Sequence, residues 1–168
     1  MSLVKSIADF SASWKYESDS TVKMLGNLTD KSLNQKVTED GRSLGFIAWH
    51  ITISIGEMMS KAGLSFEGFD ENAPVPADAE KIKSEYEKLS TKMLFQVEKS
   101  WNDGMLNDDL NMYGQVWKRG DVLGSLLAHQ THHRGQMTVL MRQAGLKVPG
   151  VYGPSKEEWV AYGMEPMP

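Results

Sequence analysis

Residues 120–145 read GDVLGSLLAHQTHHRGQMTVLMRQAG, and this stretch decides the fold. Its apolar residues fall at intervals of three and four and form one stripe on a helix that turns about 100° per residue. The stripe consists of Val122, Leu123, Leu126, Leu127, Met137, Leu140 and Met141. Asp121 is a suitable N-cap, and Gly145 is typical of the position just after a helix. We therefore predict a long amphipathic helix that packs against other helices through this stripe.

Three further segments show the same helical period. The first spans residues 3 to about 29, the second follows Ser43 and ends at Gly63, and the third runs from about Asp78 to Trp101. Four long helices with few strand signals predict an all-α protein. The architecture that we expect is a four-helix bundle.

Turn-rich segments separate these helices. Residues 65–76 are rich in Gly, Asp and Pro and predict a loop, and residues 101–120 predict a loop with at most one short strand pair. After the last long helix, Ser155 with Glu158 three residues later is a capping-box pattern for a short C-terminal helix. We therefore expect one domain over residues 1–168. It is an up-down bundle with a long connection before the last long helix.

The composition excludes several classes of protein. The chain has 168 residues, of which 40 % are hydrophobic and 24 % charged, as in globular proteins. No apolar run approaches about 18 residues and charges interrupt the N-terminal segment, so we expect neither a membrane span nor a signal peptide. A net charge of −4 without a basic cluster disfavours a nucleic-acid partner. Cysteine is absent, which excludes cysteine nucleophiles, Cys-ligated zinc and iron–sulfur clusters. The expected location is the cytoplasm.

Three of the four histidines lie close together in the last long helix, and the helical wheel separates them. His133 lies roughly 30° and His129 roughly 70° from the centre of the apolar stripe, whereas His132 lies roughly 130° away, near solvent. His129 and His133 are four residues apart, so their rings lie one turn apart on one face. This spacing allows two imidazoles to bind one metal ion, as in H-x-x-x-H zinc sites. The alternative is a pair of hydrogen-bonded core histidines.

A metal site also needs a third ligand from another helix. His50 is the remaining histidine, and the wheel leaves its role open. It lies roughly 110° from the main stripe of its helix, on a flank shared with Phe46, Ile53 and Glu57. Gln130 stands where the motif H-E-x-x-H has its glutamate, so a metallopeptidase of that type is disfavoured.

Two stretches of the chain resemble one known family. IAWH at 47–50 and HQTHHRGQMTVLMRQAGLKVPGVYGPSKEEW at 129–159 are similar to the DinB family, also called DinB/YfiT-like metalloenzymes. The resemblance spans nearly the whole chain, and the run His-x-x-x-His-Arg-Gly-Gln is its specific part. It implies a four-helix bundle that holds one divalent metal ion through His50, His129 and His133. It also implies a homodimer and, through the family's name, a link to the response to DNA damage, a form of stress.

The resemblance also implies a class of chemistry. Relatives with known reactions are transferases and isomerases that use bacillithiol, mycothiol or glutathione. We therefore expect a metal-dependent enzyme that acts on a small molecule, a thiol-dependent transferase or a hydrolase, with zinc or nickel as the metal. Three histidines leave a coordination position free, where zinc lowers the pKa of water to about 7 or holds a substrate thiol as thiolate. The alternatives are a non-catalytic metal-binding stress-response protein and a helical dimer without metal.

Three polar residues are candidates for supporting roles. Glu57, seven residues after His50, is a candidate catalytic group, or else an ordinary solvent-facing glutamate. Gln136, three residues after His133, faces either the site and its substrate pocket or a neighbouring helix. Arg134 either meets an anionic substrate or is solvated; the second is the commoner situation for a helical arginine.

Aromatic residues are candidates for the wall of a substrate pocket. They are Trp49, Tyr113 and Trp117. The alternative for all three is a place in the core or in a dimer contact. The expected partners are thus a small-molecule substrate, a low-molecular-weight thiol and a second copy of the chain, with neither nucleic acid nor membrane.

Overall fold

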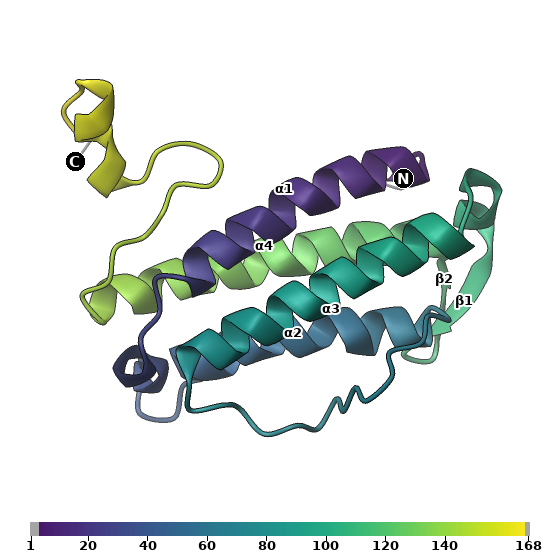
Figure 1. The fold of residues 1–168 in the computed structure, drawn as a ribbon, viewed down its shortest axis with the longest axis horizontal. Coiled ribbons are helices and arrows are strands. Elements are labelled where there is room, and N and C mark those ends of the chain that lie inside the picture. The colour runs from purple at the N-terminus through teal and green to yellow at the C-terminus, as the bar shows by residue number, and fades with distance from the viewer. Residues whose placement is uncertain (1–3, 167–168) are drawn as a thin grey trace.

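The computed structural model describes residues 4–166, and four long helices dominate it (Figure 1). They are α1 (Ile7–Leu25), α2 (Leu44–Lys61), α3 (Ala79–Ser100) and α4 (Arg119–Gln143). Three short 3₁₀ helices are η1 (Asp30–Asn34), η2 (Asp103–Asn107) and η3 (Lys156–Tyr162), and two strands are β1 (Asp109–Met112) and β2 (Gln115–Lys118). The predicted four-helix bundle with a short C-terminal helix is confirmed, and that last helix is of the 3₁₀ type.

Local sequence explains where the helices begin. In the first three long helices, a side chain just before the helix accepts a hydrogen bond from a first-turn N–H that would otherwise lack a partner. These caps are Ser6, Ser43 and Asp78. The first helix begins at Ile7, so residues 4–6 precede it, and residue 3 lies outside the described part of the chain. The prediction of Asp121 as an N-cap is wrong, because α4 begins at Arg119 and Asp121 lies within its first turn. There its carboxylate is favoured by the positive end of the helix dipole.

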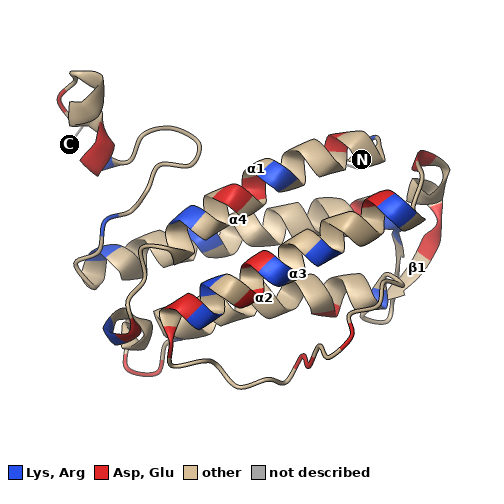
Figure 2. Cartoon of the chain, viewed as in Figure 1, with Lys and Arg blue, Asp and Glu red and all other residues tan. Residues whose placement is uncertain are grey.

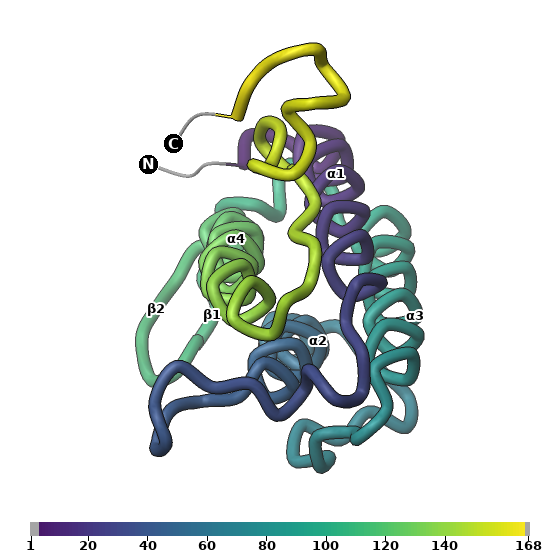
Figure 3. Tube along the Cα trace, turned by 90° about the vertical axis from the view of Figure 1, so that its left-hand side faces the viewer, coloured from purple at the N-terminus to yellow at the C-terminus, as the bar shows by residue number. Residues whose placement is uncertain are grey.

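The helices pack around the core in the order α1, α3, α2, α4, so the chain neighbours α1 and α2 lie diagonally opposite each other (Figure 3). Residues 62–78, which we call the strap, run back along the outside of α2 and α3 (Figure 1). An extended chain gains about 3.3 Å per residue against 1.5 Å in a helix, so the strap is long enough to return to the starting end of α2. As a result α2 and α3 are parallel.

The long connection before the last long helix is present as predicted, over residues 101–118. The strap is a second long connection, so the up-down order holds from α1 to α2 and from α3 to α4 but not from α2 to α3. The connection before α4 carries an antiparallel hairpin in which Asp109 pairs with Lys118. Its two turn residues, Tyr113 and Gly114, have φ values of 56° and 78°, which is typical of the primed turns that join twisted strands.

The interior is apolar and the charges lie outside it. The largest fully buried side chains are Trp14, Tyr86, Phe10, Met24, Leu25, Leu44, Ile51, Ile55, Met59, Ile82, Met93 and Met112. Acidic and basic residues alternate along α3 in Figure 2, so this helix presents no surface of a single sign. Within residues 4–166, no helix combines the length and the apolar character that crossing a membrane requires.

The segment after α4 turns back and packs against the middle of α1. Tyr16 of α1 donates a hydrogen bond from its hydroxyl to the carbonyl of Val151. Glu158 accepts hydrogen bonds from the backbone N–H groups of Gly150 and Ser155, at 3.0 and 3.1 Å, which closes the turn before η3. The glutamate that the capping-box pattern singled out therefore does organise the start of the last helix.

Candidate metal centre

Three histidines from two helices converge between α2 and α4. His50 comes from α2, and His129 and His133 come from α4, one turn apart. The Nε2 atom of His129 lies 3.1 Å from Nε2 of His50 and 3.1 Å from Nε2 of His133. Metal-ligating nitrogens of all three residues lie within 4.8 Å of one another. The antiparallel packing of α2 against α4 brings these residues together, so the flank of α2 that carries His50 faces α4.

The spacing of the nitrogens fits a metal ion. Zinc binds histidine nitrogen at about 2.0–2.1 Å, so two nitrogens of a tetrahedral site lie about 3.3 Å apart. The two measured separations of 3.1 Å are close to that value. Three converging imidazole nitrogens cannot all be satisfied by one another, because a neutral ring has one N–H and one lone pair. A cation at their centre would satisfy all three lone pairs.

Gln136 determines which nitrogen of His133 carries the proton. Its Oε1 lies 2.7 Å from Nδ1 of His133. An amide oxygen only accepts, so Nδ1 is the donor and the lone pair of Nε2 points toward the other two rings. This is the outer hydrogen bond by which metal-bound histidines are usually oriented. The corresponding Nδ1 of His129 is buried and has no hydrogen-bond partner among the described residues.

The surroundings keep the three rings neutral. Burial, the largest cause, and the nearby His133 and His50 together lower the pKa of His129 to about 4. Burial is also the main cause of the lowered pKa of His50 and of His133. Neutral imidazole is the form that binds a metal ion, so at neutral pH no proton has to be displaced.

The fourth histidine does not belong to the cluster. His132 is exposed, and its ring lies edge-on to that of His133 with the centroids 4.9 Å apart. Within residues 4–166, the cluster contains no fourth His and no Asp or Glu. The described part of the chain therefore offers three ligands, one fewer than a closed structural zinc site uses.

A cation and an aromatic ring flank the cluster on one side. The ring of Phe46 stacks almost parallel to that of His50, with an interplanar angle of 10° and centroids 6.1 Å apart. The guanidinium of Arg42 lies 5.0 Å from the centre of the Phe46 ring. Arg42 and Gln136 also line a hollow of about 350 Å³ beside the cluster. Arg42 was not among the residues predicted from the sequence. It stands four residues before Phe46 and eight before His50, a spacing that indicates a shared helical face.

Glu57 is held on the other side of the cluster by the hairpin. Its carboxylate accepts a hydrogen bond from the hydroxyl of Tyr113 at 2.7 Å and pairs with Lys61 at 3.0 Å. Burial and this hydrogen bond to Glu57 both raise the pKa of Tyr113. Glu57 is thus neither an isolated solvent-facing residue nor a hydrogen-bond partner of the histidines. Of the predicted pocket aromatics, Tyr113 lies nearest to this arrangement, with Trp117 beside it at a centroid distance of 5.9 Å.

The other predicted pocket residues have different positions. Gln136 contacts His133, as described. Trp49, although adjacent to His50 in the chain, donates its indole N–H to the carbonyl of Ala73 at 2.9 Å and lines a cavity between α2, α3 and the strap. Trp117 donates its N–H to Gln115 at 3.1 Å, within its own strand. The structure therefore brings Gln136 to the centre and directs Trp49 elsewhere.

Arg134 is not solvated. It is 3 % exposed, forms an ion pair with Glu17 of α1, and donates to the hydroxyl of Tyr152 at 2.9 Å. Next to it, Gln130 is fully buried; it accepts from the hydroxyl of Tyr86 at 2.9 Å and donates to the carbonyl of Ile51 at 3.0 Å. This network was not predicted from the sequence. Gln130 and Arg134 are four residues apart, as His129 and His133 are, and each follows one of these histidines directly.

Comparison with known proteins places the chain among relatives of one kind. The family model described as the DinB family matches residues 2–166. The chain is 44 % identical over 163 residues to the uncharacterized protein YrdA of Bacillus subtilis (strain 168), which covers 97 % of this chain and 98 % of YrdA. A crystal structure of a DinB-like protein from Bacillus cereus ATCC 10987 is also 44 % identical, with a TM-score of 0.84 over 89 % of this chain and 100 % of that one.

A more distant solved structure shares the fold alone. YfiT from Bacillus subtilis is described as a "probable metal-dependent hydrolase with an unusual four-helix bundle topology". It is 13 % identical to this chain, with a TM-score of 0.64 over 84 % of this chain and 89 % of its own. The family match over almost the whole chain, the close relatives and the bundle with its three convergent histidines agree: this protein belongs to the DinB family.

Proposed function

We propose that this protein is a metal-dependent enzyme that holds one divalent metal ion, zinc or nickel, through His50, His129 and His133, and that it acts on a small molecule. The observation that carries the proposal is the convergence of three imidazole nitrogens within 4.8 Å, without a fourth protein ligand among residues 4–166. Structural zinc sites use four protein ligands, whereas catalytic sites use three and keep one position open. The description of YfiT as a metal-dependent hydrolase supports the same reading.

The reaction is either hydrolysis or transfer to a low-molecular-weight thiol. A divalent metal ion supplies Lewis acidity, which favours the deprotonated form of water or of a thiol at neutral pH. The chain has no cysteine, so in a transfer reaction the sulfur comes with a cosubstrate. The same three histidines would hold the metal ion in either reaction.

The surrounding residues orient the ligands and the substrate. Gln136 accepts the Nδ1–H of His133 and so keeps Nε2 directed at the centre. Phe46 stacks on His50 and restricts rotation of its ring. Arg42, above Phe46, places a positive charge at the edge of the centre, where it would attract an anionic group of a substrate.

Metal content of the tag-free protein tests the site. We expect about one metal ion per chain in the wild type after reconstitution with zinc or nickel, and a loss of the metal in His50→Ala, His129→Ala and His133→Ala. His132→Ala is the matched control, because His132 lies on the same helix outside the cluster, and it should keep the metal. Circular dichroism establishes that each variant is folded. Wild-type protein that binds neither metal would overturn the proposal.

Turnover by the metal-loaded protein tests the reaction. Ester and amide substrates with and without bacillithiol, glutathione or a simple thiol distinguish the two classes. Turnover without thiol shows hydrolysis, and turnover that needs thiol shows transfer. Fully metal-loaded protein without activity in either panel would favour the alternative, a metal-binding protein without catalysis.

A further inference from the structure

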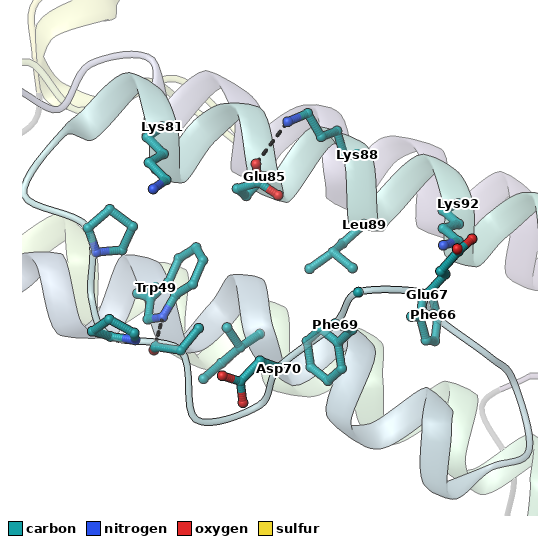
Figure 4. A pocket seen from close by; sticks show the side chains of 15 residues that line it. Trp49, Phe66, Glu67, Phe69, Asp70, Lys81, Glu85, Lys88, Leu89 and Lys92 are labelled. Carbon is teal, nitrogen blue, oxygen red and sulfur yellow. Dashed lines mark hydrogen bonds and ion pairs between the residues drawn. The ribbon is translucent and has the colours of Figure 1, made fainter.

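A second cavity, of about 440 Å³, lies between α2, α3 and the strap (Figure 4). Trp49 and Ile53 of α2, Leu89 of α3 and Phe69 of the strap form apolar parts of its lining. Phe69 packs directly on Gly56, where a Cβ atom would lie 2.5 Å from the ring. Glycine at this position therefore allows the strap to approach α2 closely. The volume is within the range of about 300–1,000 Å³ found for small-molecule sites.

The wall made by the strap is anchored on both sides of the cavity. Near the end of α2, Gln96 of α3 donates to the carbonyl of Ser65 at 2.7 Å and accepts from its N–H at 3.2 Å. Toward the other end, Trp49 donates its indole N–H to the carbonyl of Ala73 at 2.9 Å. These bonds fix the strap against α2 and α3, and a preformed site loses little conformational entropy on binding.

The charges around the cavity are unevenly distributed. The charged lining residues are Lys81, Glu85, Lys88 and Lys92 of α3 and Glu67 and Asp70 of the strap. Glu85 forms an ion pair with Lys88 at 2.8 Å, whereas the ammonium groups of Lys81 and Lys92 have no hydrogen bond or ion pair within residues 4–166 (Figure 4). The two acidic residues of the strap come earlier in the chain than the part of the strap next to Lys81. That part contributes Ala73, Pro74 and Pro76. The end of the cavity that carries Lys81 therefore holds a cation without a partner, and Lys92 lies at the other end, where the strap contributes Glu67 (Figure 4).

We propose that this cavity binds a small amphipathic carboxylate, with its apolar part against Trp49, Ile53 and Leu89 and its carboxylate at Lys81. The lining contains as many acidic as basic residues, so a single negative charge fits better than a phosphate or a polyanion. This site is separate from the metal centre. None of the three clustered histidines lines the cavity, and it lies on the side of α2 that faces α3, not the side that faces α4.

Calorimetric titration of the full-length protein with sodium octanoate tests the proposal. We expect saturable binding with one octanoate per chain and weaker binding of 1-octanol, which has the same apolar part without the charge. Lys81→Gln should weaken octanoate binding about tenfold while leaving 1-octanol binding unchanged. Lys99→Gln is the matched control, because Lys99 has the same charge on the same helix and does not line the cavity. Leu89→Trp fills the cavity and should abolish binding of both compounds.

The His129→Ala variant separates this site from the metal centre, since a carboxylate could also bind a metal ion. Octanoate binding that persists in His129→Ala and weakens in Lys81→Gln supports the proposal. Binding that is lost in His129→Ala and unchanged in Lys81→Gln places octanoate at the metal and overturns it. Equal affinity for octanoate and 1-octanol, tighter binding of octyltrimethylammonium, or no saturable binding at millimolar octanoate would also overturn it.

Discussion

Helix α4 carries two pairs of polar residues with the same i, i+4 spacing, one position apart along the chain. His129 and His133 face α2, and their nitrogens meet those of a third histidine, so that lone pairs point at one another. Gln130 and Arg134 face the bundle interior and α1, and there the amide nitrogen of Gln130 and both terminal nitrogens of Arg134 have acceptors. Both pairs lie on the buried part of the helix. The first leaves its bonding capacity open for a ligand, and the second uses it to join helices.

Within one helix, we therefore link the histidine pair to function and the Gln130–Arg134 pair to stability. A buried polar group is tolerated when its hydrogen bonds are complete and is destabilising when they are not. The Gln130–Arg134 side meets that condition within the protein. The histidine side would meet it on binding a cation, as the proposed function requires. We therefore expect substitutions on the two sides to change different measured quantities.

The largest effect on stability is expected for Arg134→Met. The substitution leaves the carboxylate of Glu17, which is 12 % exposed, without its cation. Breaking a buried ion pair in this way lowers the free energy of unfolding by about 3–5 kcal/mol. Urea denaturation of the metal-free protein measures it. Metal content of the folded fraction should stay at the wild-type level.

Arg142→Met is the control for that variant. Arg142 pairs with Glu157 at 3.3 Å on the surface, with the two side chains 44 % and 34 % exposed. Its loss should lower the free energy of unfolding by at most about 1 kcal/mol. If Arg134→Met were as stable as the wild type but had lost the metal, the division between the two sides of α4 would be wrong.

Tyr86→Phe tests the same side more gently. The tyrosine hydroxyl donates the shorter of the hydrogen bonds to Oε1 of Gln130, at 2.9 Å. Burial raises the pKa of Tyr86, so its hydroxyl stays protonated and can donate. Removing it leaves a buried acceptor poorly satisfied and should lower the free energy of unfolding by about 1–3 kcal/mol. Thermal unfolding checks this. Tyr162→Phe, on the exposed last helix, should change stability by less than about 0.5 kcal/mol.

Gln136→Ala tests the histidine side. It removes the acceptor for Nδ1–H of His133, so the ring loses its orientation. We expect metal affinity to fall about 10- to 100-fold, measured by competition with a chromophoric chelator. The stability of the metal-free protein should hardly change, because Gln136 is exposed. Gln143→Ala, also exposed on α4, should leave the affinity at the wild-type value; a similar loss there would remove the support for a specific role of Gln136.

A pH dependence of the stability is expected for the metal-free protein. Burial and, after it, the neighbouring His133 and His50 lower the pKa of His129 from 6.5 to about 4, so the folded protein stays neutral there while the unfolded chain takes up a proton. The free energy of unfolding is therefore highest above pH 6.5 and falls as the pH decreases from 6.5 to about 4. Denaturation at several pH values should show this slope in the wild type and in His132→Ala. In His129→Leu the slope should be smaller, and an equal slope would assign it to other groups.

Much of the fold followed from the sequence because helix formation is a local property. The apolar period placed all four long helices, and Ser43 and Asp78 marked two of their starts, as the structure confirms. The prediction of Asp121 as an N-cap was wrong, because aspartate is favourable within the first turn of a helix as well as at its N-cap. The expectation that Arg134 is solvated was wrong for a different reason. A single apolar stripe predicts one buried side, whereas α4 also packs against α1 and therefore has two buried sides.

The sequence by itself determined which residues share a helical face: a spacing of four fixes the relative directions of His129 and His133, and of Gln130 and Arg134. Only the tertiary structure decided which neighbour each face meets. Whether His50 joins the cluster, and whether Trp49 beside it lines the same site or another cavity, depends on the parallel course of α2 and α3 that the strap imposes. Sequence periodicity gives the directions of side chains around one helix axis, whereas contacts between distant segments depend on how several helix axes are arranged in space.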